Sequence, residues 1–387
     1  MSEDLRRRLR LYPLAERPNK VDIERDCVAP DSPLPVLADC AASVLDETVA
    51  RIRSANSAGR PVMLAFGAHT IKNGLGPILR ELIEGGWVQH LATNGAGVIH
   101  DWEFAFQGKS SEDVRANVAT GRFGIWRETG FNINLALALG AFDGLGYGES
   151  VGRLIATEKH VVPERADLVR LLSAGSGGSG GYRRVAAAAD LLALIDEFQL
   201  EPGTSHVPHP WKRYSIQAAA YAAGVPFTAH PMFGHDIVYT HPLNCGAAVG
   251  RTAERDFLTF ATRVADLQDG VYLSVGSAVM SPMIFEKSLS MAQNLALQEG
   301  RRVTGHFIVV VDLAESRWDW SRGEPPQDSP DYYLRFCKTF NRMGGELRYV
   351  SADNRTFLPH LLHSLKQATP GTPPPEPDVS LTQPQAE

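Results

Sequence analysis

The chain is poor in the features that mark disulfide scaffolds, thiolate zinc sites and nucleic-acid binders. Its 387 residues include only four cysteines, which are widely scattered and form no CxxC pair: Cys27, Cys40, Cys245 and Cys337. This scarcity argues against a disulfide framework and fits a reducing cytosol. The net charge is −6, and the short basic run RRRLR lies among acidic residues, as in a solvated helix face. Nucleic-acid binding is therefore disfavoured.

Long apolar runs are also missing. No stretch approaches the ~18 apolar residues of a membrane span, and the charged N-terminal segment has no apolar core of signal-peptide length. We therefore expect a soluble, cytoplasmic protein with no membrane partner. With 44% hydrophobic residues the chain can bury a substantial core, as one large α/β domain or two smaller ones.

Composition divides the chain into three parts. Residues 1–35 are rich in charge and proline, which predicts an irregular arm lying on a core or on a neighbouring subunit. Residues 36–367 carry regular apolar patterns and are predicted to form a single domain. Residues 368–387 are polar and proline-rich, which predicts disorder.

One pattern recurs through the predicted domain: an apolar run, a loop of small or polar residues, and usually a helical pattern. The runs are PVMLAF (61–66), VQHLAT (88–93), GVPFTAH (224–230), GVYLSVG (270–276), HFIVVV (306–311) and ELRYVSA (346–352). Short apolar strands that alternate with helices indicate parallel pairing with helices on both faces. The predicted fold class is α/β, with a doubly wound, mainly parallel sheet.

The loops after these strands are rich in chemically able side chains. In an open parallel sheet, ligands bind beyond the carboxyl ends of the strands, so the loops should share one crevice. Carboxylates and lysines are seldom buried unless paired, which makes their collection here a functional signal. The residues are His69, Lys72, Asn94, His100, Asp101, His230, His235, Asp236, Ser277, Ser281, Asp312, Asp319 and Asp353.

Two of the loops, TNGAG and VGSA, place small residues where a backbone can approach a nucleotide pyrophosphate at the start of a helix. The alternative is that these glycines only make tight corners. Neither loop is a complete GxGxxG or Walker motif, so a standard dinucleotide fingerprint is absent. The glycine–serine run SAGSGGSGGY (173–182) follows no apolar strand and is most simply a flexible loop or linker.

Histidines gather in SHVPHP and HPMFGHDIVYTHP. Neutral imidazoles beside a carboxylate could hold a divalent metal ion. The chain has no HExxH or HxH spacing, however, and loop histidines are more often structural. We therefore assign no metal site from the sequence, while a metal-dependent hydrolase stays open as an alternative.

Taken together, the loops resemble the deoxyhypusine synthase family over most of residues 60–366. The similar stretches keep the family's order and spacing: FGAHTIKNGLGPILRELIEGGWVQHLATNGAGVIHDWE, SIQAAAYAAGVPFTAHPMFGHDIVY, SVGSAVMSPMIFEKSLSMAQNL, VDLAESRWDWS and LRYVSADNRTFLPHLL. The resemblance implies a Rossmann-like fold, NAD as cofactor, a polyamine or other small amine as substrate, and a homotetramer with active sites at subunit interfaces. It also implies aminobutyl transfer to a protein lysine or to a small amine, the latter as in homospermidine synthase.

The resemblance also assigns roles to residues. It places Asn94, Gly95, Ala96, Gly276, Ser277, Ala352 and Asp353 against NAD. It gives substrate contacts to His69, Asp101 and Asp319. It gives catalytic roles to Lys338, His100 and Asp236.

Two departures from the family pattern affect the predicted chemistry. The family lysine follows tryptophan and glycine, whereas the nearest candidate here is Lys338 in LRFCKTF. The family's lysine–histidine–histidine is replaced by MSP, so its catalytic histidine is missing. A catalytically lapsed NAD-binding scaffold is therefore a further alternative.

Overall fold

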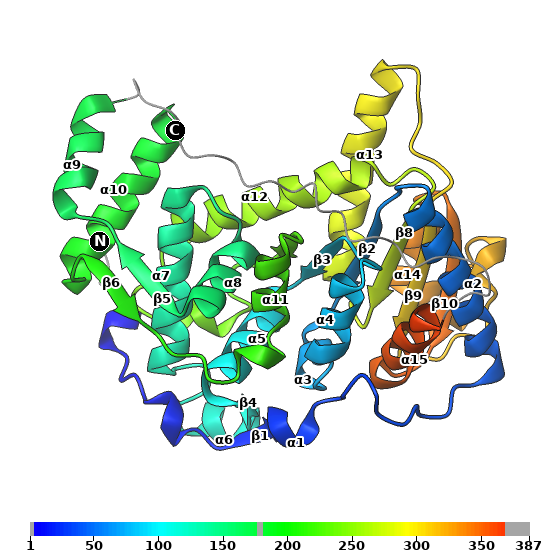
Figure 1. Cartoon of the computed structure of the whole chain (residues 1–387), viewed down its shortest axis with the longest axis horizontal. Coiled ribbons are helices and arrows are strands. Elements are labelled where there is room, and N and C mark those ends of the chain that lie inside the picture. The colour runs from blue at the N-terminus through cyan, green and yellow to red at the C-terminus, as the bar shows by residue number, and fades with distance from the viewer. Residues whose placement is uncertain (1–3, 176–180, 368–387) are drawn as a thin grey trace.

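The computed structural model describes residues 4–175 and 181–367, and a six-stranded parallel sheet forms the core of its right-hand half in Figure 1. The prediction of a doubly wound α/β fold with six strands is confirmed. Each predicted run contains one strand: β2 (Val62–Phe66), β3 (His90–Thr93), β7 (Phe227–Ala229), β8 (Val271–Val275), β9 (Phe307–Asp312) and β10 (Glu346–Ser351).

The strand order across the sheet is β10-β9-β8-β2-β3-β7. Numbered by their appearance in the chain, the six strands read 6-5-4-1-2-3. That is the order of doubly wound dinucleotide-binding sheets, read from the other edge. The direction of winding reverses between β2 and β8, so the sequence-neighbouring loops diverge there and leave a crevice at the carboxyl ends.

Alternate residues of each strand reach opposite faces of the sheet and enter two separate cores. On one face Leu64 and Phe66 pack in a core shared with α2 (Asp39–Ser57), α4 (Gly76–Glu84) and α15 (Asn354–Lys366). On the other, Met63 and Ala65 pack with α12, α13 and α14, which span Gly246–Ala265, Met280–Gln298 and Arg335–Asn341. Burial on both faces explains why these strands read as continuous apolar runs.

A large helical insertion lies between β3 and β7. It forms the left side of the molecule in Figure 1, beside the sheet. Its longer helices are α5 (Gly95–Gln107), α7 (Arg127–Asp143), α8 (Tyr147–Thr157), α9 (Arg165–Ala174), α10 (Gly181–Phe198) and α11 (Ile216–Ala223). It also holds α6 (Val114–Ala119) and the antiparallel pair β5 (Lys159–Val162) and β6 (Gly203–His206). Helix α7 is buried along almost its whole length, so this insertion has its own packed interior.

The N-terminal arm, predicted to be irregular, contains short regular elements in its described part. Strand β1 (Asn19–Asp22) pairs antiparallel with β4 (Lys109–Glu112), and α1 (Ile23–Asp26) follows it directly. Leu14 and Ile23 are buried in the main core. The arm differs from the prediction because these two apolar anchors and a strand pairing fix its path, which its charge and proline content hid.

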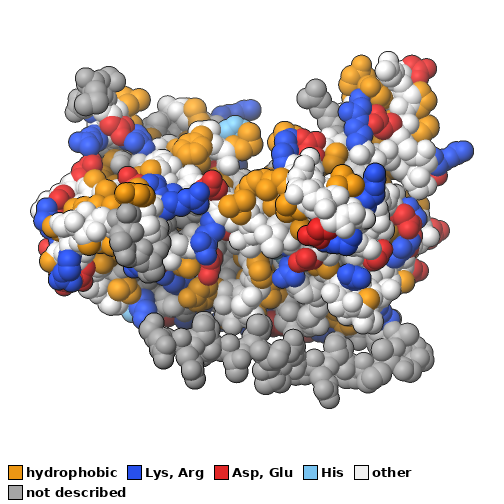
Figure 2. Space-filling model, turned by 90° about the horizontal axis from the view of Figure 1, so that it is seen from above, with side chains coloured by type: hydrophobic (Ala, Val, Ile, Leu, Met, Phe, Trp, Pro, Cys, Tyr) orange, Lys and Arg blue, Asp and Glu red, His pale blue; other side chains and the backbone are white. Residues whose placement is uncertain are grey.

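On the face shown in Figure 2, acidic and basic side chains are interspersed over the coloured part of the surface. No helix within residues 4–175 and 181–367 is long and apolar enough to span a bilayer. The core of the glycine–serine run (176–180) and the predicted disordered tail (368–387) lie outside the described residues.

Candidate functional site

The crevice begins at a backbone-to-backbone contact between two glycines at the point where the winding reverses. Gly67 follows β2 and donates its N–H to the carbonyl of Val275 at 3.0 Å. A Cβ at Gly67 would lie 2.0 Å from the carbonyl oxygen of Gly276, which follows β8 with φ +58. Only glycine fits the first position, and the second takes a left-handed conformation that favours glycine. The two loops therefore start in close contact and without side chains.

A hollow of about 250 Å³ opens from this contact across the ends of β8, β9 and β10. It brings together five of the residues that the sequence predicted for a site, although they lie far apart in the chain. They are His69, Gly276, Asp312, Ala352 and Asp353, joined by Asn73, Val311, Leu313 and Asn354.

Two carboxylates stand on the rim of this hollow. Asp312 ends β9 and accepts the N–H of Ala314 at 3.0 Å. Asp353 follows β10 and caps α15 by accepting the N–H of Arg355 at 2.7 Å. Each carboxylate has a second oxygen for which the described part of the chain shows no donor. Paired carboxylates with free acceptor oxygens suit the hydroxyl groups of a ribose.

The turn after β3 forms the other side of the crevice. Asn94 caps α5 by accepting the N–H of Gly97 at 2.9 Å. The N–H groups of Gly95 and Ala96, in the first helical turn, have no partner inside the helix. Such free amides at the positive end of a helix attract an anionic group.

Asp236 lies directly against this turn. A Cβ at Gly95 would be 2.1 Å from Asp236 Oδ2, which is buried and has no hydrogen-bond partner among the described residues. Burial raises the pKa of Asp236 to about 6, and nearby His235 lowers it slightly. The carboxyl group therefore changes charge close to neutral pH, which is useful for proton transfer.

Two tyrosines with buried hydroxyl groups share the surroundings of Asp236. The hydroxyl groups of Tyr147, at the start of α8, and Tyr239, in the turn Ile237–Thr240, have no hydrogen-bond partner in the described chain. Burial raises the pKa of both, that of Tyr239 to about 12, and the charge of Asp236 adds to each shift. Three unsatisfied polar atoms in one buried region call for a bound water or ligand.

On the neighbouring face of α5, a buried ion pair anchors His100 through a serine. Arg17 of the arm donates to both carboxylate oxygens of Glu103 at 2.7 and 2.6 Å, and both side chains are about 1% exposed. Burial alone would raise the pKa of Glu103, but the charge and hydrogen bonds of Arg17 hold it below the ordinary value. Ser110 donates to Glu103 at 2.6 Å and contacts His100 Nδ1 at 2.7 Å.

This chain of contacts sets the tautomer of His100. The single hydroxyl proton of Ser110 goes to Glu103, so Ser110 accepts a hydrogen bond from the N–H at His100 Nδ1. Nε2 is then the basic nitrogen. Burial lowers the pKa of His100 to about 4; the carboxylate of Glu103 raises this pKa, whereas Lys72 and Arg17 lower it further. At neutral pH His100 is therefore an uncharged imidazole and a weak base.

Asp101 lies elsewhere than predicted. Instead of facing a substrate, its carboxylate is buried and accepts hydrogen bonds from Ser215 Oγ, the N–H groups of Ile216 and Gln217, and Gln217 Nε2. It holds the start of α11 against α5. A neighbouring position on a helix points about 100° away, so His100 and Asp101 serve different neighbours.

Three other residues predicted for the site do not line the hollow at the ends of β8, β9 and β10 of their own chain. Ser277 is buried and its hydroxyl accepts the N–H of Ser281, in the first turn of α13, at 3.2 Å. Asp319 is exposed and accepts hydrogen bonds from Ser321. Lys338 lies on α14 with Nζ 3.4 Å from the centre of the Tyr332 ring, and it lines a separate hollow behind Ser277 with Val279.

The histidine-rich loops have structural surroundings. His230 contacts Thr228, His241 Nδ1 accepts the N–H of Leu243, and His209 packs edge-on against the stacked rings of Trp102 and Phe106. Within residues 4–175 and 181–367, no three histidine, cysteine, aspartate or glutamate side chains are grouped to hold a metal ion.

Sequence reasoning missed Arg17, Glu103, Tyr147 and Tyr239. Glu103 follows His100 by three residues on the same helix face, and that spacing was the available signal. Arg17 lies in the charged arm, where solvation was the natural interpretation. No local pattern identifies Tyr147, because it reaches Asp236 only through the packing of the helical insertion. Tyr239 lies three residues after Asp236, and that closeness in the chain was the available signal.

No protein-family model matches the chain, and no curated protein matches its sequence. Solved structures that resemble it include the ternary complex of AgrE with ornithine and NAD+, at 15% identity and TM-score 0.42, covering 86% of this chain and 34% of that one. A putative LOR/SDH protein from Methanococcus maripaludis S2 matches at 14% identity and TM-score 0.41, with 87% and 73% covered. A putative deoxyhypusine synthase from Entamoeba histolytica matches at 11% identity and TM-score 0.39, with 85% and 89% covered.

The chain spans about a third of the length of the AgrE chains and of a cyanobacterial arginine dihydrolase, ArgZ, which it also resembles at 13% identity and TM-score 0.39. Likeness at this level does not identify an activity. The functional argument therefore depends on the geometry of the crevice.

Proposed function

We propose that the protein is an NAD-dependent enzyme that oxidises a small amine or polyamine by hydride transfer. The observation that carries the proposal is the crevice between β2 and β8. Two loops that each begin with a glycine meet there and open into a hollow with two carboxylates on its rim. Its position and its strand order are those at which doubly wound sheets bind dinucleotides.

The residues present fit such a cofactor. Asp312 and Asp353 would accept the hydroxyl protons of a ribose, and Gly67 and Gly276 let the cofactor approach the backbone. Across the crevice, the free amides of Gly95 and Ala96 offer a place for an anionic group. When bound, NAD accepts a hydride from the carbon beside the substrate nitrogen.

The residues beside α5 would handle the substrate's charge and proton. A protonated amine must lose a proton before hydride leaves, and His100 Nε2 would hold that proton only transiently, because the low pKa of His100 makes it a weak base. Lys72 and His69 disfavour the resulting imidazolium, so His100 readily passes the proton on. Ionised Asp236 attracts a cationic amine, and its pKa near 6 leaves it mostly ionised at neutral pH.

The family-like second half of the reaction passes an aminobutyl group to an amine, and it requires contributions from Lys338 and Asp319. In the proposed homotetramer the exposed Asp319 and the partly buried Lys338 would reach the site of a neighbouring subunit. Turnover that stays unchanged in Lys338→Ala would reject its nucleophilic role, and unchanged polyamine affinity in Asp319→Asn would reject that contact.

Calorimetric titration with NAD+ tests the cofactor. We expect saturable binding to the full chain, weakened in Asp353→Ser, because serine keeps the cap of α15 but removes the charge. The matched control is Asp113→Ser at the start of α6, which should bind normally. Absence of binding up to about millimolar NAD+ would overturn the proposal. Spermidine-dependent formation of NADH, lost in His100→Asn, tests the chemistry.

A further inference from the structure

A further hollow, of about 720 Å³, lies among the end of α7, the start of α10 and the middle of α12 (Figure 1). Its size is typical of a small-ligand site. Four arginines and two acids line it, on a chain whose net charge is −6. We call it the arginine hollow, after Arg183, Arg184, Arg251 and Arg255. It includes none of the residues assigned to the NAD crevice, so it is a separate place in the molecule.

Part of the charge in the arginine hollow is already neutralised. Arg251 pairs with Asp190 of α10 at 2.9 Å, and Asp143 pairs with Arg153 of α8 at 2.7 Å. Glu254 is then the one acid of the lining without a basic side chain at ion-pair distance in the described part of the chain. A single carboxylate cannot balance the three arginines that remain, so the hollow keeps a positive surplus. Like charges that share a hollow repel one another, and a bound anion would offset this cost.

Two of the unpaired arginines, Arg183 and Arg184, are neighbours at the start of α10. Neither has a carboxylate at ion-pair distance within residues 4–175 and 181–367. Arg184 Cζ lies 5.4 Å from the centre of the Phe142 ring at the end of α7, a cation–π contact that holds the side chain in place. The Arg184 side chain is exposed, so the second face of its planar guanidinium group is open to a ligand.

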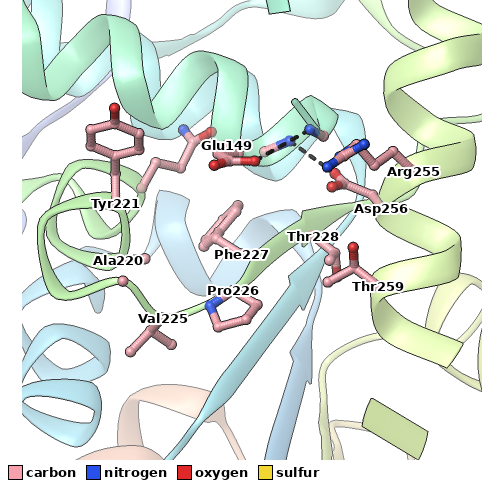
Figure 3. Close-up of a pocket in the computed structure, with 14 residues that line it drawn as sticks. Glu149, Ala220, Tyr221, Val225, Pro226, Phe227, Thr228, Arg255, Asp256 and Thr259 are labelled. Atoms are coloured by element: carbon pink, nitrogen blue, oxygen red, sulfur yellow. Dashed lines mark hydrogen bonds between the residues drawn. The ribbon is translucent and has the colours of Figure 1, made fainter. Parts of the chain in front are cut away.

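The third unpaired arginine, Arg255, comes from α12, where Figure 3 shows it beside Asp256. Asp256 does not neutralise it, because its buried carboxyl accepts the N–H groups of Gly148 at 2.9 Å and Ala229 at 2.7 Å. Burial also raises the pKa of Asp256 to about 8, so this group carries little negative charge at neutral pH. Arg255 Nη1 instead lies over the turn after α7, 3.7 Å from the place where a Cβ at Gly144 would stand. It therefore belongs to the arginine hollow.

We propose that the arginine hollow binds a nucleoside di- or triphosphate. Phosphate groups accept paired hydrogen bonds from guanidinium groups, and a chain of two or three phosphates neutralises Arg183, Arg184 and Arg255 together. The base stacks on the face of the Arg184 guanidinium group that does not meet Phe142. Leu258 lines the same hollow, is 45% exposed and adds apolar contact. Inorganic phosphate alone would neutralise part of the charge but leave this open face and the apolar wall uncovered.

Calorimetry on the full chain with ATP tests this inference. We expect saturable binding with a Kd below about 1 mM. Inorganic tripolyphosphate, which lacks the base and the ribose, should bind at least about tenfold more weakly. The double variant Arg184→Gln/Arg255→Gln should weaken ATP binding by about tenfold or more, because each guanidinium group supplies charge-assisted hydrogen bonds. Both side chains are exposed, so the variant should fold.

Arg165→Gln/Arg170→Gln is the matched control, because it removes the same charge from two exposed arginines of α9. It should leave the affinity for ATP unchanged, and so should Asp353→Ser in the NAD crevice. Absence of saturation at about 1 mM ATP would overturn the proposal. So would equal losses in the two double variants, equal binding of tripolyphosphate and ATP, or a loss in Asp353→Ser, which would place ATP in the NAD crevice. The ATP measurements do not depend on NAD binding.

Discussion

The two halves of the sheet's carboxyl edge are built in different ways. The half formed by β8, β9 and β10 presents backbone and partly exposed carboxylates, which also cap turns or helices. The half beside β3 and β7 presents buried titratable groups, His100 and Asp236, whose pKa values are shifted by burial. The first half is suited to binding by shape and hydrogen bonds, and the second to moving protons.

The halves also differ in what supports them. The binding half is made by loops that directly follow their own strands. The half beside β3 and β7, proposed for proton transfer, depends on Arg17 from the arm, on Tyr147 from the insertion, and on Tyr239 from the turn after β7. Substitutions should therefore affect the two halves by different mechanisms.

The largest effect should come from Glu103→Gln, which removes the bidentate partner of the buried Arg17 guanidinium and leaves it only the more distant carboxylate of Glu112, at 3.9 Å. We expect a loss of about 3–5 kcal/mol in the free energy of unfolding, measured with urea. The control is Glu84→Gln, in the exposed pair with Arg80, which should cost less than about 1 kcal/mol. Equal losses in the two variants would contradict the importance of the buried pair.

The next effect should be a pH-dependent stabilisation by Asp236→Asn. The folded-state pKa of Asp236 is about 6, above its ordinary value of 3.8. The unfolded chain therefore releases this proton first, and the wild-type protein loses stability as the pH rises from about 4 to about 6. Asparagine avoids this loss, so the variant should gain up to about 3 kcal/mol at pH 8 and nothing near pH 3.5.

Urea unfolding of the wild-type protein and of Asp236→Asn, at pH 8 and near pH 3.5, measures this difference in the free energy of unfolding. Asp101→Asn is the contrasting variant, because Asp101 accepts four hydrogen bonds and its replacement should destabilise the protein at pH 8. A destabilised Asp236→Asn at pH 8 would show that Asp236 has a partner after all.

A smaller effect is expected at the contact between the two loops. Gly67→Ala places a methyl group against the carbonyl of Gly276 and should cost about 1–3 kcal/mol, with weaker NAD+ binding. Gly250→Ala, in the middle of α12 and with open space around it, should instead stabilise the helix by up to about 1 kcal/mol. Melting temperatures and calorimetry compare the two.

The smallest effect should follow removal of one tyrosine hydroxyl. Tyr239→Phe removes a hydroxyl group that has no hydrogen-bond partner among the described residues, so the free energy of unfolding should change by less than about 0.5 kcal/mol. Tyr349→Phe removes a hydroxyl that donates to the carbonyl of Ala314 and should cost about 1 kcal/mol. A larger loss for Tyr239 would reveal an unseen hydrogen bond, such as one through an ordered water.

The sequence predicted the binding half better than the proton-transfer half, for a physical reason. Six apolar runs identify the strands, and in a parallel sheet the residue after each strand must lie at the same edge. That rule alone brings Gly276, Ala352 and Asp353 together. The role of Asp101 could not be predicted, because it depends on how α11 packs against α5, more than a hundred residues later in the chain.

The anchoring of His100 shows the same limit. Arg17 and Glu103 meet only because Leu14 and Ile23 fix the arm to the core. The arm was predicted as irregular, and nothing local in its sequence identifies an arginine that is buried. Long-range pairs of this kind are decided by tertiary packing, which short patterns do not record.

The ion pair between Arg17 and Glu103 has a practical consequence for protein production. A shortened version of this protein that begins after Arg17 would keep every strand of the sheet and every residue assigned to NAD. It would nevertheless leave the Glu103 carboxylate in the interior without the charge of Arg17, with Ser110 and Thr129 as its remaining hydrogen-bond donors. Trimming the first segment to aid crystallisation would thus remove one half of a buried ion pair, and the shortened protein should be markedly less stable.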